Sequence, residues 1–137
     1  MDYEHEAHVL VADDDPSIRQ LLCTVVRRER LDVDCVADGQ EAIDRLREHD
    51  YSVILLDLMM PRVDGAEFLR QLASLDLSTR SRPVVLLMTA FSNDRLPVIG
   101  EPIHAVVKKP FDIEDLVALV SGCVEQRKAH EAIKRER

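Results

Sequence analysis

The sequence has no long apolar run, no low-complexity tract and no excess of positive charge. Its apolar runs fall well short of the roughly 18 residues of a membrane span, and residues 1–6 (MDYEHE) are acidic where a secretory signal is basic and then apolar. The formal net charge of −8 argues against a nucleic-acid surface, which needs clustered Lys and Arg. We expect a cytoplasmic protein that binds neither membranes nor nucleic acids, and the charge is better suited to a divalent cation or a cationic partner.

Cysteine is also scarce, with Cys23, Cys35 and Cys123 as the complete set. They are odd in number, widely spaced and set in apolar periodic segments. This distribution favours reduced core residues and indicates neither a disulfide framework nor a zinc site.

The length of 137 residues and the hydrophobic content of 46% predict one domain with a substantial core. We assign this domain to residues 8–126, after a solvated tail at 1–7. Residues 127–137 are mixed in charge and helix-prone, so they form either a helical extension or linker, or a frayed, solvated end. Ala129 and Ile133 are too few apolar positions for a coiled coil, which favours the frayed end.

The central stretch of the chain is Val53–Leu56, four large aliphatic residues that end at Asp57. Such a run is too short for a globular helix and is typical of a strand buried on both faces of a parallel sheet. Strands are also predicted at 9–12, roughly 32–37, 84–88 and 105–107. Helical periodicity separates most of them, as in the stripe of Ile18, Leu21, Leu22, Val25 and Val26. The alternation predicts an α/β fold, a doubly wound, five-stranded parallel sheet with helices on both sides.

Chemically useful residues follow the ends of four of these strands: Asp13, Asp14, Asp57, Thr89 and Lys109. The carboxyl ends of parallel strands share one edge of the sheet, where ligands bind in open α/β folds. Three other acids are better explained as helix N-caps: Asp15 before Pro16, Asp38 with Glu41 three residues later, and Asp112.

This set of residues suits phosphoryl transfer to an aspartate. Asp57 is the candidate nucleophile, which would form an acyl phosphate. Asp13, Asp14 and Asp57 can hold Mg²⁺, which prefers a few carboxylates together with water and phosphate oxygens. Lys109 would supply a movable positive charge and Thr89 a hydroxyl donor for phosphate oxygens.

Four segments resemble the receiver domain of two-component response regulators over roughly residues 7–126: VLVADDDPSIR (9–19), LLDLMMPRVDG (55–65), MTA (88–90) and KKPF (108–111). The resemblance implies a flavodoxin-like (βα)5 fold in which a histidine kinase or phosphotransfer protein phosphorylates Asp57. It also implies that Asp14, Asp57 and the backbone carbonyl of Met59 ligate Mg²⁺ or Mn²⁺, assisted by Asp13.

In that family the residues at Thr89 and Lys109 contact the phosphoryl group, and the Lys109–Pro110 bond is typically cis, which would aim the lysine inward. The only chemistry then expected is the phosphorylation and dephosphorylation of Asp57, without turnover of a substrate, and the downstream target is an unidentified protein or output domain. Nothing in the sequence resembles an output domain, so a single-domain regulator and a piece of a longer one both remain open.

The sequence departs from the family pattern between Thr89 and Lys109. Pro97 and Pro102 flank Gly100, and each proline removes a helical hydrogen bond, so the fourth helix is expected to be short, displaced or absent. Val106 stands where the family commonly has an aromatic residue whose rotation reports phosphorylation. The usual switch and the usual fourth-helix dimer face are therefore in doubt.

Two other functions compete with this interpretation. A haloacid-dehalogenase-type phosphatase also uses an aspartate nucleophile with Mg²⁺, but it has a second acid two residues later, where this chain has Met59. A phosphate-independent interaction module would keep the fold alone, and the prolines before Lys109 favour that alternative.

We predict slow loss of the phosphoryl group, because Met59 and Phe91 are bulky and apolar and flank the path that water takes in this family. Replacing both by alanine (Met59→Ala, Phe91→Ala) should speed dephosphorylation severalfold by opening that path. The measurement is the decay of labelled protein after removal of the phosphodonor. Equal decay in the wild type and the double variant would reject the idea.

Overall fold

The computed structural model describes residues 8–58, 65–75, 83–89 and 103–135. The strands are β1 (His8–Ala12), β2 (Asp32–Val36), β3 (Val53–Asp57), β4 (Val84–Thr89) and β5 (Ile103–Lys108). The helices are α1 (Pro16–Arg28), α2 (Gly39–Glu48), α3 (Gly65–Ser74) and α4 (Ile113–Arg135). Among the described residues, no helix is both long and apolar enough to span a membrane.

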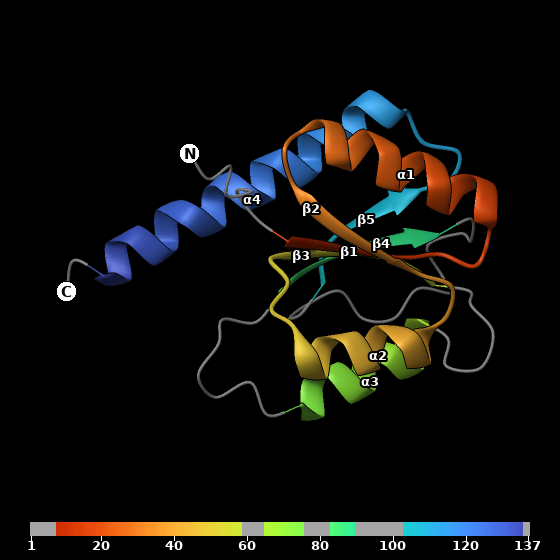
Figure 1. Ribbon diagram of the computed structural model, residues 1–137, viewed down its shortest axis with the longest axis horizontal. Helices are drawn as coiled ribbons and strands as arrows, with labels where there is room; N and C mark the ends of the chain where they lie inside the picture. The colour runs from red at the N-terminus through yellow and green to blue at the C-terminus, as the bar shows by residue number, and fades with distance from the viewer. Residues whose placement is uncertain (1–7, 59–64, 76–82, 90–102, 136–137) are drawn as a thin grey trace.

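The five strands form one parallel sheet in the order β2-β1-β3-β4-β5. Helices α1 and α4 cover one face, and α2 and α3 cover the other (Figure 1). Side chains alternate between the faces, so Leu10 and Ile54 join the α2/α3 core while Val9 and Val11 join the α1/α4 core. All four are fully buried, which confirms the doubly wound fold expected from the aliphatic runs.

The strand bounds differ slightly from the prediction. Strand β2 ends one residue early, at Val36, and β5 begins two residues early, at Ile103. The early start of β5 reflects pairing of Ile103 with Val85, followed by an irregularity in the ladder. The predicted short or missing fourth helix falls in 90–102, outside the described residues.

The three predicted N-caps are confirmed. The Asp15 carboxylate accepts hydrogen bonds from the backbone N–H groups of Ser17 and Ile18, at 2.9 and 3.3 Å. Asp38 accepts from Glu41 N–H, and Asp112 accepts from the N–H groups at the start of α4. These acids satisfy backbone donors at the helix starts.

Helix α4 continues through Arg135 and extends beyond the sheet toward the C-terminus (Figure 1). The expectation of a frayed end is therefore wrong for residues 127–135. Within this segment the Arg127 guanidinium donates to the backbone carbonyl of Tyr51, at 2.8 Å. This contact joins residues 76 positions apart in the chain, so apolar periodicity did not indicate it.

The prediction that all three cysteines are reduced is also wrong. Cys23 of α1 and Cys35 of β2 form a disulfide, with their Cα atoms 6.7 Å apart. Their spacing of 12 residues gave no sign of pairing, because the contact arises only when α1 packs on the edge strand β2. Cys123 is a free, buried thiol as expected, and burial raises its pKa.

A hydrogen-bonded cluster joins His8, the first residue of β1, and Tyr51, which precedes β3, to Asp34 in the middle of β2. The Tyr51 hydroxyl donates to Asp34 Oδ2 at 2.5 Å, and His8 Nε2 lies 2.9 Å from the same oxygen. The rings of His8 and Tyr51 are 4.6 Å apart. Burial, followed by the bond to Asp34, raises the pKa of Tyr51 well above its ordinary value.

We predict that Tyr51 makes folding less favourable at alkaline pH. Because the folded state raises the pKa of Tyr51, the unfolded chain loses the phenolic proton first, and the free energy of unfolding falls above about pH 10 by up to about 1.4 kcal/mol per pH unit. The free energy of unfolding of Tyr51→Phe should be about 1 kcal/mol lower than that of the wild type near neutrality. It should then fall less steeply as the pH rises above about 10. Urea unfolding from pH 8 to 11 measures both slopes, and parallel slopes would contradict the prediction.

Candidate functional site

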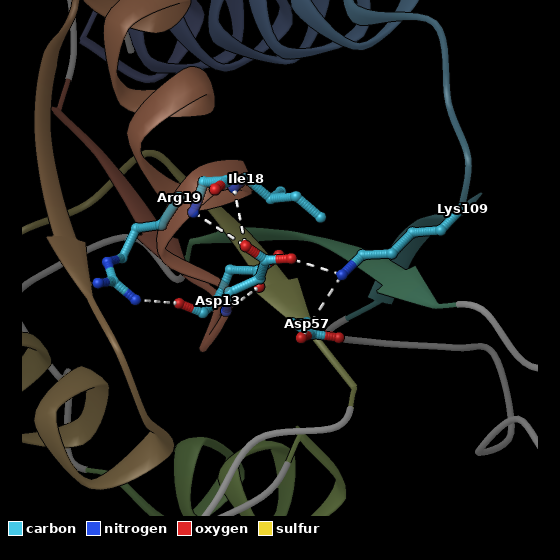
Figure 2. Close-up of polar contacts among 7 residues, drawn as sticks. Asp13, Ile18, Arg19, Asp57 and Lys109 are labelled. Atoms are coloured by element: carbon cyan, nitrogen blue, oxygen red, sulfur yellow. Dashed lines mark hydrogen bonds and ion pairs between the residues drawn. The ribbon is translucent and has the colours of Figure 1, made fainter.

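Asp13 is the most enclosed acid at the carboxyl edge of the sheet, with none of its surface exposed. Its N–H donates to the Val36 carbonyl at 3.2 Å, which extends the β1–β2 ladder by one residue. Its Oδ1 accepts from the Asp15 N–H at 2.9 Å, and its carbonyl accepts from Arg19 Nη1 at 2.8 Å (Figure 2). The backbone and the side chain of Asp13 are therefore both fixed by neighbours.

The Lys109 ammonium lies between two carboxylates (Figure 2). Lys109 Nζ is 3.2 Å from Asp13 Oδ2 and 3.6 Å from Asp57 Oδ2. Asp57 is the last residue of β3 and is 6% exposed. The lysine reaches the two carboxylates from the segment after β5, and its peptide bond to Pro110 is cis, as the resemblance implied.

Asp14 completes a cluster of three acids. One carboxylate oxygen from each of Asp13, Asp14 and Asp57 lies within 4.8 Å of the other two. Asp13 and Asp57 are buried, whereas Asp14 is exposed. Lys109 balances one of the three negative charges, so a divalent cation would relieve the remaining repulsion. A set of hard oxygen donors open to solvent on one side fits Mg²⁺, which retains water in its shell.

Thr89 lies at the same edge, as the last residue of β4. It is 1% exposed, and its carbonyl accepts the Lys109 N–H at 2.7 Å. The preceding residue, Met88, pairs with Asp57 across the sheet. Thr89 is thus linked through the backbone to Lys109 and is one position beyond the strand partner of Asp57. The remaining predicted ligand, the Met59 carbonyl, and the predicted water-path residue Phe91 both lie outside the described residues.

Arg19 is a component that the sequence pattern did not identify. An arginine one turn into an amphipathic helix ordinarily faces solvent, but this guanidinium turns back to the Asp13 carbonyl. The only available signal was its place within the 9–19 segment. The structure therefore places the Arg19 guanidinium of α1 next to Asp13, a member of the acid cluster.

The fold and the arrangement of these residues are those of a CheY-like α/β protein. The model of the response regulator receiver domain matches residues 9–121. The chain therefore belongs to the receiver domain family of two-component response regulators.

Individual relatives agree with this assignment. The chain is 34% identical over 133 residues to the transcriptional regulatory protein TrcR of Mycobacterium tuberculosis, covering 92% of this chain and 50% of TrcR. The Francisella response regulator 1452 receiver domain matches with a TM-score of 0.77 and 28% identity, covering 88% of this chain and 98% of that one. TrrA of Thermotoga maritima, in complex with Mg(2+)-BeF, matches with a TM-score of 0.71 and 26% identity, covering 85% and 98%. The chain spans about half the length of the curated relatives it matches.

We predict that the acid cluster binds Mg²⁺ and Mn²⁺ and that adjacent acids contribute unequally. Asp14→Asn should weaken metal binding by about tenfold or more, because it removes a ligand charge from the cluster. Asp15→Asn removes the same charge one residue away, and asparagine can still cap the helix. Because exposed charges outside the cluster are screened by salt, this change should alter the affinity for the metal by less than about threefold.

Free Mn²⁺ measured by electron paramagnetic resonance, with Mg²⁺ as competitor, gives both affinities. An equal loss in the two variants would mean that general charge, rather than the Asp13, Asp14 and Asp57 cluster, attracts the metal.

Proposed function

We propose that this chain is a phosphoacceptor receiver, in which Asp57 accepts a phosphoryl group from a histidine kinase or a histidine phosphotransfer protein. The observation that carries the proposal is the Lys109 ammonium, held 3.6 Å from Asp57 Oδ2 and 3.2 Å from Asp13 Oδ2. A fixed cation beside a buried carboxylate is the arrangement needed to neutralise an incoming phosphoryl group.

In the proposed reaction a carboxylate oxygen of Asp57 attacks phosphorus and the bond from phosphorus to the donor nitrogen breaks. The imidazole leaves with its electron pair, and an acyl phosphate forms on Asp57. Lys109 balances charge on the phosphoryl oxygens, and the Thr89 hydroxyl is the proposed hydrogen-bond donor to one of them. Phosphorylation and dephosphorylation of Asp57 are then the only chemistry, without turnover of a substrate.

We assign Asp13, Asp14 and Asp57 as the residues that hold Mg²⁺, or Mn²⁺ in its place, together with the Met59 carbonyl. The bound cation would supply charge neutralisation and orientation of phosphoryl oxygens. Asp13 and Asp57 fit this role because both are buried, and their carboxylates lie beside Lys109 and the Asp14 carboxylate.

The proposed biological setting is a cytoplasmic two-component pathway or phosphorelay. The relatives named as transcriptional regulatory proteins are about twice the length of this chain, so the transcriptional role is a statement about those proteins. For this chain we propose residues 8–126 as the receiver and 127–137 as a helical extension or linker, with an unidentified downstream protein or output domain as the target of the signal. Continuation of α4 through Arg135 supports the second assignment.

We predict that acetyl phosphate and Mg²⁺ add one phosphoryl group to the wild type and none to Asp57→Asn, because the amide is a far weaker nucleophile than the carboxylate. Asp44→Asn is the matched control, since it makes the same change at an exposed position of α2. Intact-protein mass spectrometry measures the label.

The rival functions give different results in the same assay. Sustained release of phosphate from a small ester, dependent on Asp57, would indicate a phosphatase. Absence of label in the wild type, together with normal folding and metal binding, would indicate a phosphate-independent interaction module and overturn the proposal.

A further inference from the structure

The disulfide between Cys23 and Cys35 joins α1 to β2, the edge strand of the sheet. Cys23 is 6% exposed and packs in the α1/α4 core. Cys35 is half-buried, so it is the more accessible of the two. The pair thus combines a sheltered sulfur with a partner that external thiols and disulfides can approach.

The disulfide also lies within a closed circuit around Asp13. Cys35 precedes Val36, whose carbonyl accepts the Asp13 N–H at 3.2 Å. The Asp13 carbonyl in turn accepts from Arg19 Nη1 at 2.8 Å, and Arg19 is one helical turn before Cys23 on α1. The disulfide, together with these two hydrogen bonds, therefore completes a ring of contacts that begins and ends at Asp13 and passes through β2 and α1.

From this juxtaposition we infer that Cys23 and Cys35 form a reversible redox modification site that takes small-molecule thiols and disulfides as its reactants. Its oxidised state fixes α1 against β2 and so stiffens the support of Asp13. In the cytoplasm disulfides are usually transient and regulatory, which agrees with a site that switches. The effect on phosphorylation rests on the proposed function, whereas the effect on rigidity does not.

The oxidation is a pair of thiol–disulfide exchanges. The Cys35 thiolate attacks one sulfur of the small disulfide, whose S–S bond breaks and releases one thiolate. The Cys23 thiolate then attacks the Cys35 sulfur of the mixed disulfide and displaces the second small thiolate. Two electrons pass from the cysteines to the small disulfide, and the two protons that the cysteines lose are taken up by the released thiolates. Reduction by excess small thiol is the same sequence in reverse.

Oxidation should affect Asp13 because the disulfide reduces the number of locally open conformations that α1 and β2 can adopt next to this residue. A steadier Asp13 holds Lys109 and the acid cluster in place before the donor arrives. Since misplaced groups cost reaction rate, the oxidised protein should accept a phosphoryl group faster than the reduced protein.

The test compares the wild type, Cys35→Ser and Cys123→Ser after treatment with oxidised glutathione or dithiothreitol. Alkylation under denaturing conditions should modify all three cysteines of the reduced wild type and Cys123 alone after oxidation. Hydrogen exchange followed by mass spectrometry should slow about tenfold or more in peptides from residues 13–23 and 31–37 of the oxidised protein. Labelling by acetyl phosphate should be faster by about threefold or more.

Cys123→Ser keeps Cys23 and Cys35, so its hydrogen exchange and its labelling rate should change on oxidation as in the wild type. In Cys35→Ser neither oxidised glutathione nor dithiothreitol should change hydrogen exchange or the labelling rate. Failure of glutathione to form the pair, failure of dithiothreitol to reverse it, or unchanged hydrogen exchange would overturn the inferred site. Hydrogen exchange that changes on oxidation, with equal rates of labelling by acetyl phosphate in the two redox states, would overturn the effect of the disulfide on phosphorylation. Changed exchange with no label in either state would remove the proposed function and leave the redox site intact.

Discussion

The structure depends on keeping two buried carboxylates, those of Asp13 and Asp57, beside one ammonium. Burying a charge is costly unless it is paired, and these acids are 0% and 6% exposed. Their separation is set by the sheet, because Ala12 of β1 pairs with Leu56 of β3, and Asp13 and Asp57 are the residues that directly follow these two. The hydrophobic register of β1 and β3 therefore brings together charges that would otherwise repel each other.

The apolar strands beneath the acid cluster make that arrangement rigid. Residues 9–12 and 53–56 are completely buried, and helices cover both faces of the sheet. A shift of β3 by one residue would exchange its faces and move Asp57 away from Asp13, at the cost of the whole core. The same burial that stabilises the fold thus positions the acids.

The sequence predicted what depends on local pattern. Aliphatic runs located the strands, their parallel pairing predicted one edge for Asp13, Asp57 and Lys109, and Asx-type caps located the helix starts. The Cys23–Cys35 disulfide was missed, because no local period records which helix turn lies over which strand. The same holds for the contacts of Arg19 and Arg127, which join side chains to backbone carbonyls.

Asp13, rather than Asp57, is the residue at which the elements around the acid cluster meet. Its N–H bonds to β2, its carbonyl bonds to Arg19 of α1, and its carboxylate bonds to the Asp15 N–H and to Lys109. Lys109 Nζ lies within 4 Å of both Asp13 and Asp57, so a phosphoryl group on Asp57 would compete with Asp13 for the three N–H donors of the ammonium. Any shift of the ammonium toward phosphoryl oxygens would leave the buried Asp13 carboxylate less well paired, and Asp13 would then have to adjust or draw on a metal ion. A change at Asp57 therefore has a direct physical route to α1 and β2, through contacts that do not require an aromatic residue at Val106.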